Sequence, residues 1–293
     1  MSGWQPSAPC TPAACIDPAG RAAALPRAVL RFTAVVGLVL LAVLALPLGR
    51  WLPADAIRWW CRTLVRAAGV RPAVTGAAPP ATGGVLIVAN HISWLDIPLL
   101  AAVRPARMLA KTEIRHWPVA GALAARGGTL FIDRDRLKAL PRTVAALADI
   151  LRHGAAVGVF PEGSTWCGRA QGTFRRAAFQ AALDAGVPVQ PVRLHYRVTG
   201  GPATTVPAFI GEDSLVTSLW RVVTTRGLVA EVDLRPLIPP GTHPDRRTLA
   251  RAAQPARTGE PDWLHTTLAT RRDTREPAAA LTPDRGGPAR SRP

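Results

Sequence analysis

The chain has 293 residues, 36 of them basic and 19 acidic, with a formal net charge of +17 and 48% hydrophobic residues. This length is sufficient for one domain with a substantial core and additional terminal segments. The positive charge predicts contact with polyanions, namely nucleic acid, anionic lipid headgroups or phosphorylated substrates. The four cysteines, Cys10, Cys15, Cys61 and Cys167, are scattered and show no Cys-x2-Cys spacing. A disulfide framework and a metal site are therefore not expected.

The N-terminal part of the chain contains a long uncharged segment. Residues 1–27 are rich in Pro, Ala and Ser and are expected to form a disordered leader. Residues 32–49 carry no charge, and a helix of that length extends about 27 Å, close to the hydrocarbon thickness of a bilayer. A signal peptide is the alternative, but the run is long for one and lacks a convincing cleavage site. We expect insertion into the membrane or deep embedding in its interface.

A basic amphipathic helix is predicted directly after this segment. Arg58, Arg62 and Arg66 recur every four residues and therefore share one helical face, while apolar side chains line another face. Such a helix either lies on an anionic membrane surface or packs on the following domain with its arginines in solvent. Residues 28–71 are thus expected to comprise the membrane segment and this helix.

The main domain is expected over residues 72–240, beginning with a linker at 72–84. Short apolar runs alternate there with helical periodicity, which predicts an α/β fold: a mixed sheet flanked by helices and preceded by the membrane-associated segment. The predicted strands are 85–89, 107–110, 128–132, 156–160, 187–193 and 228–234, and the predicted helices are 94–103, 136–152 and 174–185. Residues 241–293 are rich in Arg and Pro and are expected to be mostly disordered, apart from a short helix near 263–268.

The most informative segment follows the first predicted strand. The run Val-Leu-Ile-Val-Ala at 85–89 leads into Asn90 and His91, and Asp96 follows five residues after the histidine. A neutral imidazole oriented by a nearby acid is the minimum equipment for deprotonating a hydroxyl near neutral pH. The spacing alone is a weak signal, but its position at the end of a strand strengthens it.

Two further strands end in charged residues. One leads into Asp133 and Arg134, and another leads into Glu162 through the sequence Phe-Pro-Glu-Gly-Ser. Ligands in open α/β sheets bind outside the carboxyl ends of strands, so these side chains and His91 are expected to converge on one crevice. A plainer role for Glu162 is to accept backbone N–H bonds within its own turn. A third segment, Val187 to Val192, contains two prolines, which predicts an edge strand or one beside a ligand.

In this order, the four segments resemble the sequence blocks of the glycerolipid acyltransferases of the lysophosphatidic acid acyltransferase type. The blocks are Asn90-His91-x4-Asp96, Phe131 to Arg134, Phe160 to Ser164, and Val187-Pro188. The resemblance covers about residues 84–195. It implies that residues 72–240 form a catalytic domain that moves a fatty acyl chain from acyl-CoA or acyl carrier protein to the free hydroxyl of a lysolipid. No cofactor or metal is implied, and 1-acyl-sn-glycerol-3-phosphate is the first candidate acceptor.

The resemblance also implies roles for individual residues. His91 would be the general base and Asp96 would fix its tautomer, without a covalent acyl-enzyme. The positions that the resemblance associates with substrate binding are Arg134, Glu162, Gly163, Ser164 and Pro188. Among these, Arg134, Glu162 and Gly163 are associated with the acceptor, and Pro188 with the acyl donor or a hydrophobic tail.

Two positions depart from many members that act on glycerophosphates. Ile92 and Thr165 stand where those members have arginine, so fewer cations are available for a phosphate. The wording Asn-His-Ile-Ser-Trp-Leu-Asp is also similar to the bacterial lyso-ornithine lipid acyltransferases, which provide the alternative acceptor. Because the acyl donors are cytoplasmic, we expect the enzyme at the cell membrane with its catalytic domain on the cytoplasmic side.

Two other functions remain open from the sequence. A hydrolase would use the same histidine and aspartate with water as the acceptor, although a Gly-x-Ser-x-Gly motif is absent from the sequence. A membrane-tethered binding protein would act through the Arg-rich tail instead. Because aromatic residues do not alternate with the basic ones in that tail, nucleic acid is not expected as a partner. The expected partners are a lysolipid, acyl-CoA or acyl carrier protein, and the bilayer.

Overall fold

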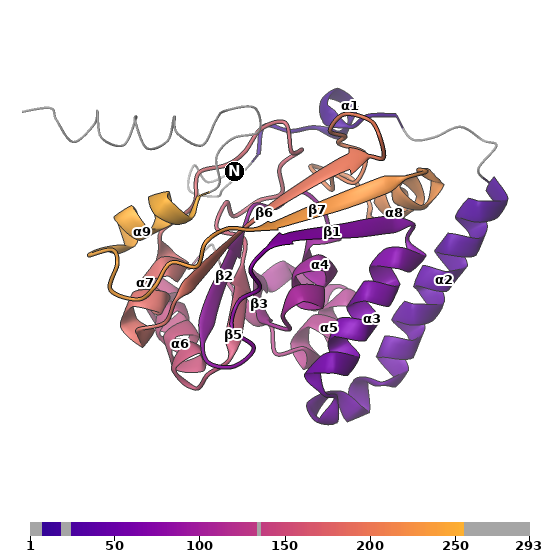
Figure 1. The fold of residues 1–293 in the computed structure, drawn as a ribbon. Coiled ribbons are helices and arrows are strands. Elements are labelled where there is room, and N and C mark those ends of the chain that lie inside the picture. The colour runs from indigo at the N-terminus through magenta and orange to yellow at the C-terminus, as the bar shows by residue number, and fades with distance from the viewer. Residues whose placement is uncertain (1–7, 19–24, 134–135, 255–293) are drawn as a thin grey trace, which may run out of the picture. The chain divides into compact units, whose positions relative to one another are not determined.

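A seven-stranded sheet with the strand order β1-β7-β6-β2-β5-β3-β4 organises the chain (Figure 1). The computed structural model describes residues 8–18, 25–133 and 136–254, all within one unit that spans Met1–Pro255. The strands are β1 Val70–Gly76, β2 Val85–Ala89, β3 Arg107–Lys111, β4 Leu130–Ile132, β5 Ala156–Val159, β6 Val189–Val198 and β7 Leu228–Leu234. Neighbouring strands are parallel except for β6 and β7, which are antiparallel. The predicted mixed α/β sheet is confirmed.

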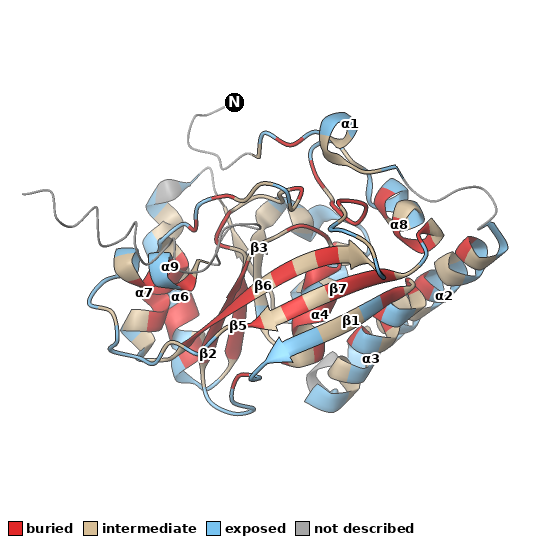
Figure 2. Cartoon of the chain, turned by 45° about the horizontal axis from the view of Figure 1, so that its top comes forward, coloured by how far each residue is buried: buried red, intermediate tan, exposed pale blue. Residues whose placement is uncertain are grey.

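Helices cover both faces of this sheet (Figures 1 and 2). They are α1 Pro12–Cys15, α2 Leu25–Leu44, α3 Ala54–Ala67, α4 Asp96–Val103, α5 Ala120–Arg126, α6 Leu140–Arg152, α7 Ala177–Ala185, α8 Leu215–Thr224 and α9 Arg246–Ala253. Short 3-10 helices occupy Leu46–Trp51, Thr112–His116 and Leu137–Ala139. Buried side chains of α3, α4 and α8 form one core with the sheet, and those of α6, α7 and α9 form the other.

Strand β2 is buried on both of its faces. Val85, Ile87 and Ala89 belong to the core that includes α3 and α4, whereas Leu86 and Val88 belong to the core that includes α6 and α7. Successive side chains of a strand point to opposite faces, so a strand between two helical layers needs an unbroken apolar sequence. This requirement explains the Val-Leu-Ile-Val-Ala run, and it fixes the place where the chain leaves the sheet after β2.

The expectation of a disordered leader is wrong for residues 8–18. Cys10 is buried in the core, and Thr11 caps the short helix α1. The carboxylate of Asp17 accepts hydrogen bonds from Thr205 N at 2.8 Å and Thr204 Oγ1 at 3.0 Å, and it pairs with Arg169. Composition alone missed this segment because its few anchoring side chains interact with residues that are far away in sequence.

The predicted linker at 72–84 is also partly wrong. Val70 to Gly76 form β1, which pairs in parallel with β7 along its whole length. The strand lies at the edge of the sheet and is largely exposed after its first residue (Figure 2). An exposed edge strand tolerates Pro72 and needs no apolar run, so its sequence resembles that of a linker.

The C-terminal tail begins later than expected. Asp245 caps α9 through hydrogen bonds from the N–H groups of Arg247 and Thr248, and Leu249 and Ala250 pack in the core beside α7. The prediction of a mostly disordered segment from residue 241 is therefore wrong up to residue 254. The short helix that we expected near 263–268 lies outside the described residues.

The expectation that places the proline-containing segment at a sheet edge is wrong as well, because β6 lies between β7 and β2. Its antiparallel pairing with β7 begins only at Val192, one residue after Pro191. The oxygen of Pro191 still accepts a hydrogen bond from Arg235 N at 3.0 Å. The missing N–H of proline thus falls at the point where the ladder with β7 has not yet started.

Helix α2 is docked on the domain rather than separate from it. Arg31 Nη1 donates hydrogen bonds to the oxygens of Val223, at 3.0 Å, and Thr225, at 2.9 Å. Trp60 Nε1 of α3 donates to Leu38 O at 3.1 Å. By length and composition alone, α2 is long and apolar enough to cross a membrane. One side of it nevertheless packs against α3 and α8 (Figure 1).

Helix α3 follows the second of its two predicted arrangements. Its apolar residues Cys61, Leu64 and Val65 are buried, and the helix packs against α4 and β1. Arg62 and Arg66 are exposed on the opposite side. The apolar face of α3 is therefore covered by the domain, while Arg62 and Arg66 stay exposed.

Candidate active site

The carboxyl end of β2 brings His91 to the first residue of α4, Asp96. The Nδ1 atom of His91 lies 2.8 Å from Asp96 Oδ2. Asp96 is completely buried, and the same oxygen accepts hydrogen bonds from the backbone N–H groups of Ile92, at 2.7 Å, and Ser93, at 2.8 Å. Because the turn between the two residues folds back on the carboxylate, the spacing of five residues places the acid beside the imidazole.

The second oxygen of Asp96 is held from across the sheet. The hydroxyl of Tyr196, in β6, donates a hydrogen bond to Asp96 Oδ1 at 2.6 Å. Burial raises the pKa of Tyr196 well above its ordinary value, and the negative charge and the hydrogen bond of Asp96 raise it further. Tyr196 therefore remains a neutral donor. The carboxylate has four hydrogen-bond donors in total, so its position relative to His91 is fixed from several directions.

The ring of His91 is also supported by its neighbours. Phe160, directly after β5, stacks on the imidazole with the ring centroids 4.0 Å apart and an interplanar angle of 13°. The backbone N–H of Trp166 donates to His91 O at 2.8 Å. The side chain of His91 keeps 20% of its surface exposed. With Nδ1 directed to Asp96, Nε2 is the ring nitrogen available to a substrate.

Glu162 connects the two loops that border this histidine. Its Oε2 accepts a hydrogen bond from His91 N at 2.7 Å, and its Oε1 accepts one from Gly172 N at 2.9 Å. Glu162 therefore accepts backbone N–H bonds, as the plainer prediction had it, but from His91 and Gly172 rather than from its own turn. Burial raises the pKa of Glu162 to about 8, although the two N–H groups favour its charged form, and the charge of Asp96 adds to the increase.

The loop that follows Glu162 contains several buried polar atoms without a protein partner. Gly163 makes the turn with a φ of +79°, a conformation that favours glycine. Among the described residues, Ser164 Oγ, Trp166 Nε1 and Gln171 Nε2 are buried and accept or donate no hydrogen bond. Buried polar atoms are normally paired. All three atoms belong to the loop whose residue Trp166 donates its backbone N–H to His91.

Other predicted site residues do not gather here. Asp133 follows β4 at the far edge of the sheet, three strands away from β2, and pairs with Arg136 at 3.4 Å. Arg134 lies outside the described residues. Pro188 immediately precedes the residue of β6 that pairs with Leu86, so it lies at the opposite end of β2 from His91, roughly 20 Å away along the strand.

Two residues hold the site together through contacts that the sequence did not predict. Asn90 joins β2 to β6, because its Nδ2 donates to Leu194 O at 2.9 Å and its Oδ1 accepts from Leu194 N at 2.7 Å. Tyr196 is the only tyrosine of the chain, and it lies 100 residues after its partner Asp96. The alternation of apolar and polar residues from Val192 to Val198 in β6 indicated that Tyr196 shares a face with Val192 and Leu194. No local pattern identified Asp96 as its partner.

The chain is similar to known proteins in sequence and in fold. A sequence model of the acyltransferase family matches residues 71–195. The lyso-ornithine lipid O-acyltransferase of Pseudomonas aeruginosa is 43% identical over 201 residues, covering 68% of this chain and 75% of that protein. The 1-acyl-sn-glycerol-3-phosphate acyltransferase of Neisseria gonorrhoeae is 40% identical over 156 residues, covering 53% of this chain and 61% of that protein.

A solved structure shows the same fold. The crystal structure of the 1-acyl-sn-glycerophosphate acyltransferase PlsC from Thermotoga maritima superposes with a TM-score of 0.59 at 18% identity, covering 87% of this chain and 98% of that one. The site described above therefore belongs to an acyl-transferring enzyme. This chain is a member of the acyltransferase family that includes lyso-ornithine lipid and 1-acyl-sn-glycerol-3-phosphate acyltransferases.

Proposed function

We propose that the protein transfers a fatty acyl group from a thioester donor to the hydroxyl of a lysolipid, with His91 as the general base. The observation that carries the proposal is the 2.8 Å contact between His91 Nδ1 and Asp96 Oδ2, which leaves Nε2 to accept a proton. The hydroxyl oxygen forms a bond to the thioester carbonyl carbon, and the carbon–sulfur bond breaks. The leaving thiolate of coenzyme A or acyl carrier protein takes the proton from the imidazolium.

The surroundings of the pair support this role. Asp96 carries its negative charge next to the ring that becomes positive, and its four hydrogen-bond donors fix its orientation. The stacked Phe160 ring restricts rotation of the imidazole. A base that is already oriented loses little entropy when the reaction begins.

For the acceptor, we propose a lyso-ornithine lipid, with 1-acyl-sn-glycerol-3-phosphate as the second candidate. Ile92 is buried in the core, so this position next to the base supplies no cation for a phosphate, and Thr165 is also uncharged. Fewer cations suit an amino-acid headgroup better than a phosphomonoester dianion. The lyso-ornithine lipid enzyme of Pseudomonas aeruginosa matches 68% of this chain, and the glycerophosphate enzyme of Neisseria gonorrhoeae matches 53%. The longer match favours the lyso-ornithine lipid, and the shorter one supports 1-acyl-sn-glycerol-3-phosphate as the second candidate.

The polar atoms of the loop after Glu162 supply candidates for headgroup contacts. The hydroxyl of Ser164 and the N–H groups of Trp166 and Gln171 are buried without partners among the described residues. A bound ester, carboxylate or phosphate would satisfy them, because all three side chains have hydrogen-bond donors. Arg134 is a further candidate for the acceptor from its position in the second sequence block.

We propose that α2 embeds the enzyme in one leaflet, with the catalytic domain on the cytoplasmic side where the donors are. One side of α2 is packed on the domain, and large apolar side chains on its other side are exposed. They are Leu25, Val29, Leu30, Val36, Leu40, Leu41 and Leu44. Trp51 and Trp59, also exposed, are residues typical of the membrane–water interface. A helix with one face covered by protein and one apolar face free suits an orientation in the interface plane.

The test is an acyl-transfer assay with membranes that contain the full chain. Labelled acyl-CoA or acyl carrier protein is offered with each lysolipid separately. The wild type is compared with His91→Ala and with a matched control, His153→Ala, whose side chain is 77% exposed at the end of α6. We expect a diacyl product that depends on His91 and not on His153, and faster turnover of the lyso-ornithine lipid.

Two results would contradict the proposal. Loss of the thioester without a lipid product would indicate a hydrolase. Activity that survives His91→Ala but is lost on removal of residues 242–293 would indicate that the tail, rather than the histidine, carries the function. A product formed only from 1-acyl-sn-glycerol-3-phosphate would keep the mechanism and replace the acceptor.

A further inference from the structure

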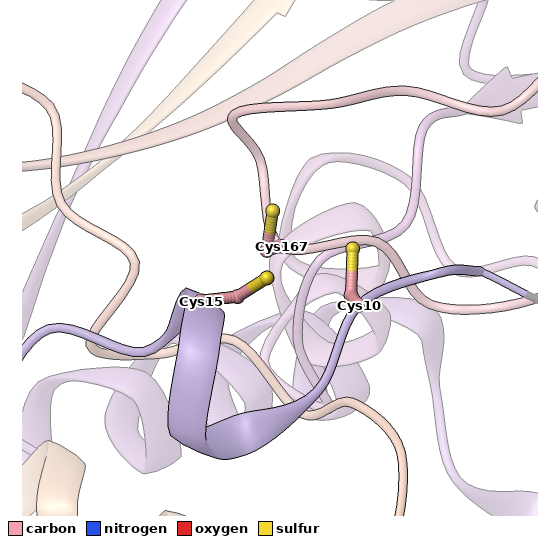
Figure 3. A group of neighbouring side chains, drawn as sticks. All are labelled: Cys10, Cys15 and Cys167. Atoms are coloured by element: carbon pink, nitrogen blue, oxygen red, sulfur yellow. The ribbon is translucent and has the colours of Figure 1, made fainter.

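Three of the four cysteines meet beside the active-site loop, although the sequence scatters them. Cys10 precedes the short helix α1 by two residues, Cys15 is the last residue of that helix, and Cys167 lies in the loop after Glu162 (Figure 3). Their sulfur atoms all lie within 4.8 Å of one another. Cys10 and Cys167 are buried and Cys15 is partly buried, and each is a free thiol. Among the described residues, no other His, Cys, Asp or Glu ligand atom joins this group.

The separation of these sulfurs is close to that of a thiolate metal site. Zinc–sulfur bonds of about 2.3 Å in a tetrahedron place the sulfurs about 3.8 Å apart. The observed cluster therefore needs a contraction of only about 1 Å, which rotation of cysteine side chains can supply. A disulfide, by contrast, joins two sulfurs and would leave the third thiol buried beside it without a role.

We propose that Cys10, Cys15 and Cys167 bind one Zn²⁺ ion, with water in the fourth position. Zinc prefers sulfur and nitrogen ligands in a tetrahedral arrangement, and three thiolates supply most of that shell. The ligand set combines a pair separated by four residues with a third residue far along the chain, so it does not match the short Cys-x2-Cys pattern. Our sequence-based expectation of no metal site depended on that pattern alone.

The segment that supplies two of the ligands is already fixed in place without the ion. Thr11 caps α1, and the N–H of Cys15 donates to Thr11 O at 3.0 Å. After the helix, Asp17 is bound by Thr204, Thr205 and Arg169. Because α1 orders the segment internally and Asp17 anchors it to the domain, the cysteines approach each other at a low cost in entropy when the ion binds.

The ion would have a structural role next to the catalytic histidine. Cys167 follows Trp166, whose N–H donates to His91 O at 2.8 Å. At Gly168, an added Cβ would lie 3.2 Å from Ile92 Cδ1, so the two loops are in close contact. A zinc ion at the cysteines would attach the N-terminal segment to the loop that contacts His91. It takes no part in the acyl transfer, and the proposal is independent of which lysolipid is used.

The test measures metal bound to the full chain, purified in detergent under reducing conditions. We expect about one zinc per chain by elemental analysis, and tetrahedral thiolate absorption bands when Co²⁺ replaces it. Cys15→Ser and Cys167→Ser should each reduce the zinc content to background. Cys61→Ser is the matched control, because Cys61 is a buried cysteine of α3 outside the cluster and its replacement should leave the zinc in place.

A second measurement keeps the proposal testable if a variant folds poorly. Cys15 is only partly buried, so its serine variant is the least disruptive. A strong chelator should lower the melting temperature of the wild type and of Cys61→Ser, but not that of Cys15→Ser. The proposal is overturned if the folded wild type neither contains zinc nor takes up added Zn²⁺ or Co²⁺. It is also overturned if Cys15→Ser retains the ion, or if mass spectrometry finds two of the three cysteines joined in a disulfide.

Discussion

The loop after β2 and the loop after β5 border the same histidine, but they differ in how many of their buried polar groups are hydrogen-bonded. In the first, residues 90–96, both oxygens of Asp96 are fully occupied, by His91, two backbone N–H groups and Tyr196. In that loop the indole N–H of Trp94 is buried and has no partner among the described residues. In the second, residues 160–176, three side-chain polar atoms are buried without a partner in the part of the chain that the structure describes.

This difference distinguishes the group that we propose as the base from the groups that we propose for ligand binding. A base works best when its orientation is set before the substrate arrives, and a saturated hydrogen-bond network achieves that. A binding loop must instead keep donors available, and leaving them buried costs folding free energy. Glu162 accepts one hydrogen bond from each loop, so it fixes the positions of the two loops relative to each other.

The largest effect is expected from a change at Asp96, in the loop after β2. Asp96→Asn retains the size of the side chain and can keep accepting from His91, Ile92 and Ser93, but it removes the negative charge beside the imidazolium. We expect kcat to fall about 10²- to 10⁴-fold while the far-ultraviolet circular dichroism stays unchanged. An activity within tenfold of the wild type would show that the charge of Asp96 is not needed by His91.

The residue shared by the two loops should control stability as a function of pH. The pKa of Glu162 is raised from 4.5 to about 8, so the folded state binds a proton between these values that the unfolded state has released. The free energy of unfolding then falls as pH rises through this window, by at most about 1.4 kcal/mol per pH unit. Glu162→Gln should flatten the dependence of the melting temperature on pH. A wild-type stability that rises from pH 5 to 8 would mean that the two N–H bonds outweigh burial.

A smaller effect is expected from a change at Tyr196, which holds Asp96 from β6. Tyr196→Phe removes the hydroxyl that donates to Asp96 Oδ1 and leaves a buried carboxylate oxygen with one donor fewer. Because the acceptor is charged, we expect a loss of about 1.5–3 kcal/mol in the free energy of unfolding, measured by urea denaturation. The double variant with Asp96→Asn should lose less than the sum of the two single variants. Additive losses would contradict the coupling between these residues.

The smallest effect is expected in the loop with unpartnered atoms. Ser164→Ala removes a buried hydroxyl that has no partner among the described residues, so stability should stay within about 0.5 kcal/mol of the wild type or rise. If the hydroxyl binds the substrate, KM for the lysolipid should increase about two- to tenfold with little change in kcat. An unchanged KM would remove Ser164 from the binding site.

The sequence was sufficient to predict the buried strands but not the exposed one. β2 and β5 are apolar throughout, and β7 has apolar, buried residues at most of its positions, so all three were predicted with bounds close to those observed. β1 contains Pro72 and Gly76 and is mostly exposed at the sheet edge. Neither an alternation of apolar and polar residues nor an apolar run therefore identified it as a strand. Helices α5, α8 and α9 were missed because they are short and lie in segments that look like connections.

The same distinction applies to the candidate site. The pairing of His91 with Asp96 is local, within six residues, and its geometry follows from the turn that joins β2 to α4. The contacts of Tyr196 with Asp96 and of Cys10 with Cys167 join positions 100 or more residues apart. Such contacts depend on strand order, which the sequence pattern does not define.

The burial of β2 on both faces has a consequence for how the enzyme loses activity. Its amides are hydrogen-bonded to β6 on one side and β5 on the other, and helices cover both of its surfaces. Amides in such a strand exchange with deuterium only when the whole domain opens. The histidine at its end is thus attached to the slowest-exchanging part of the molecule, so heat inactivation and global unfolding should occur at the same temperature.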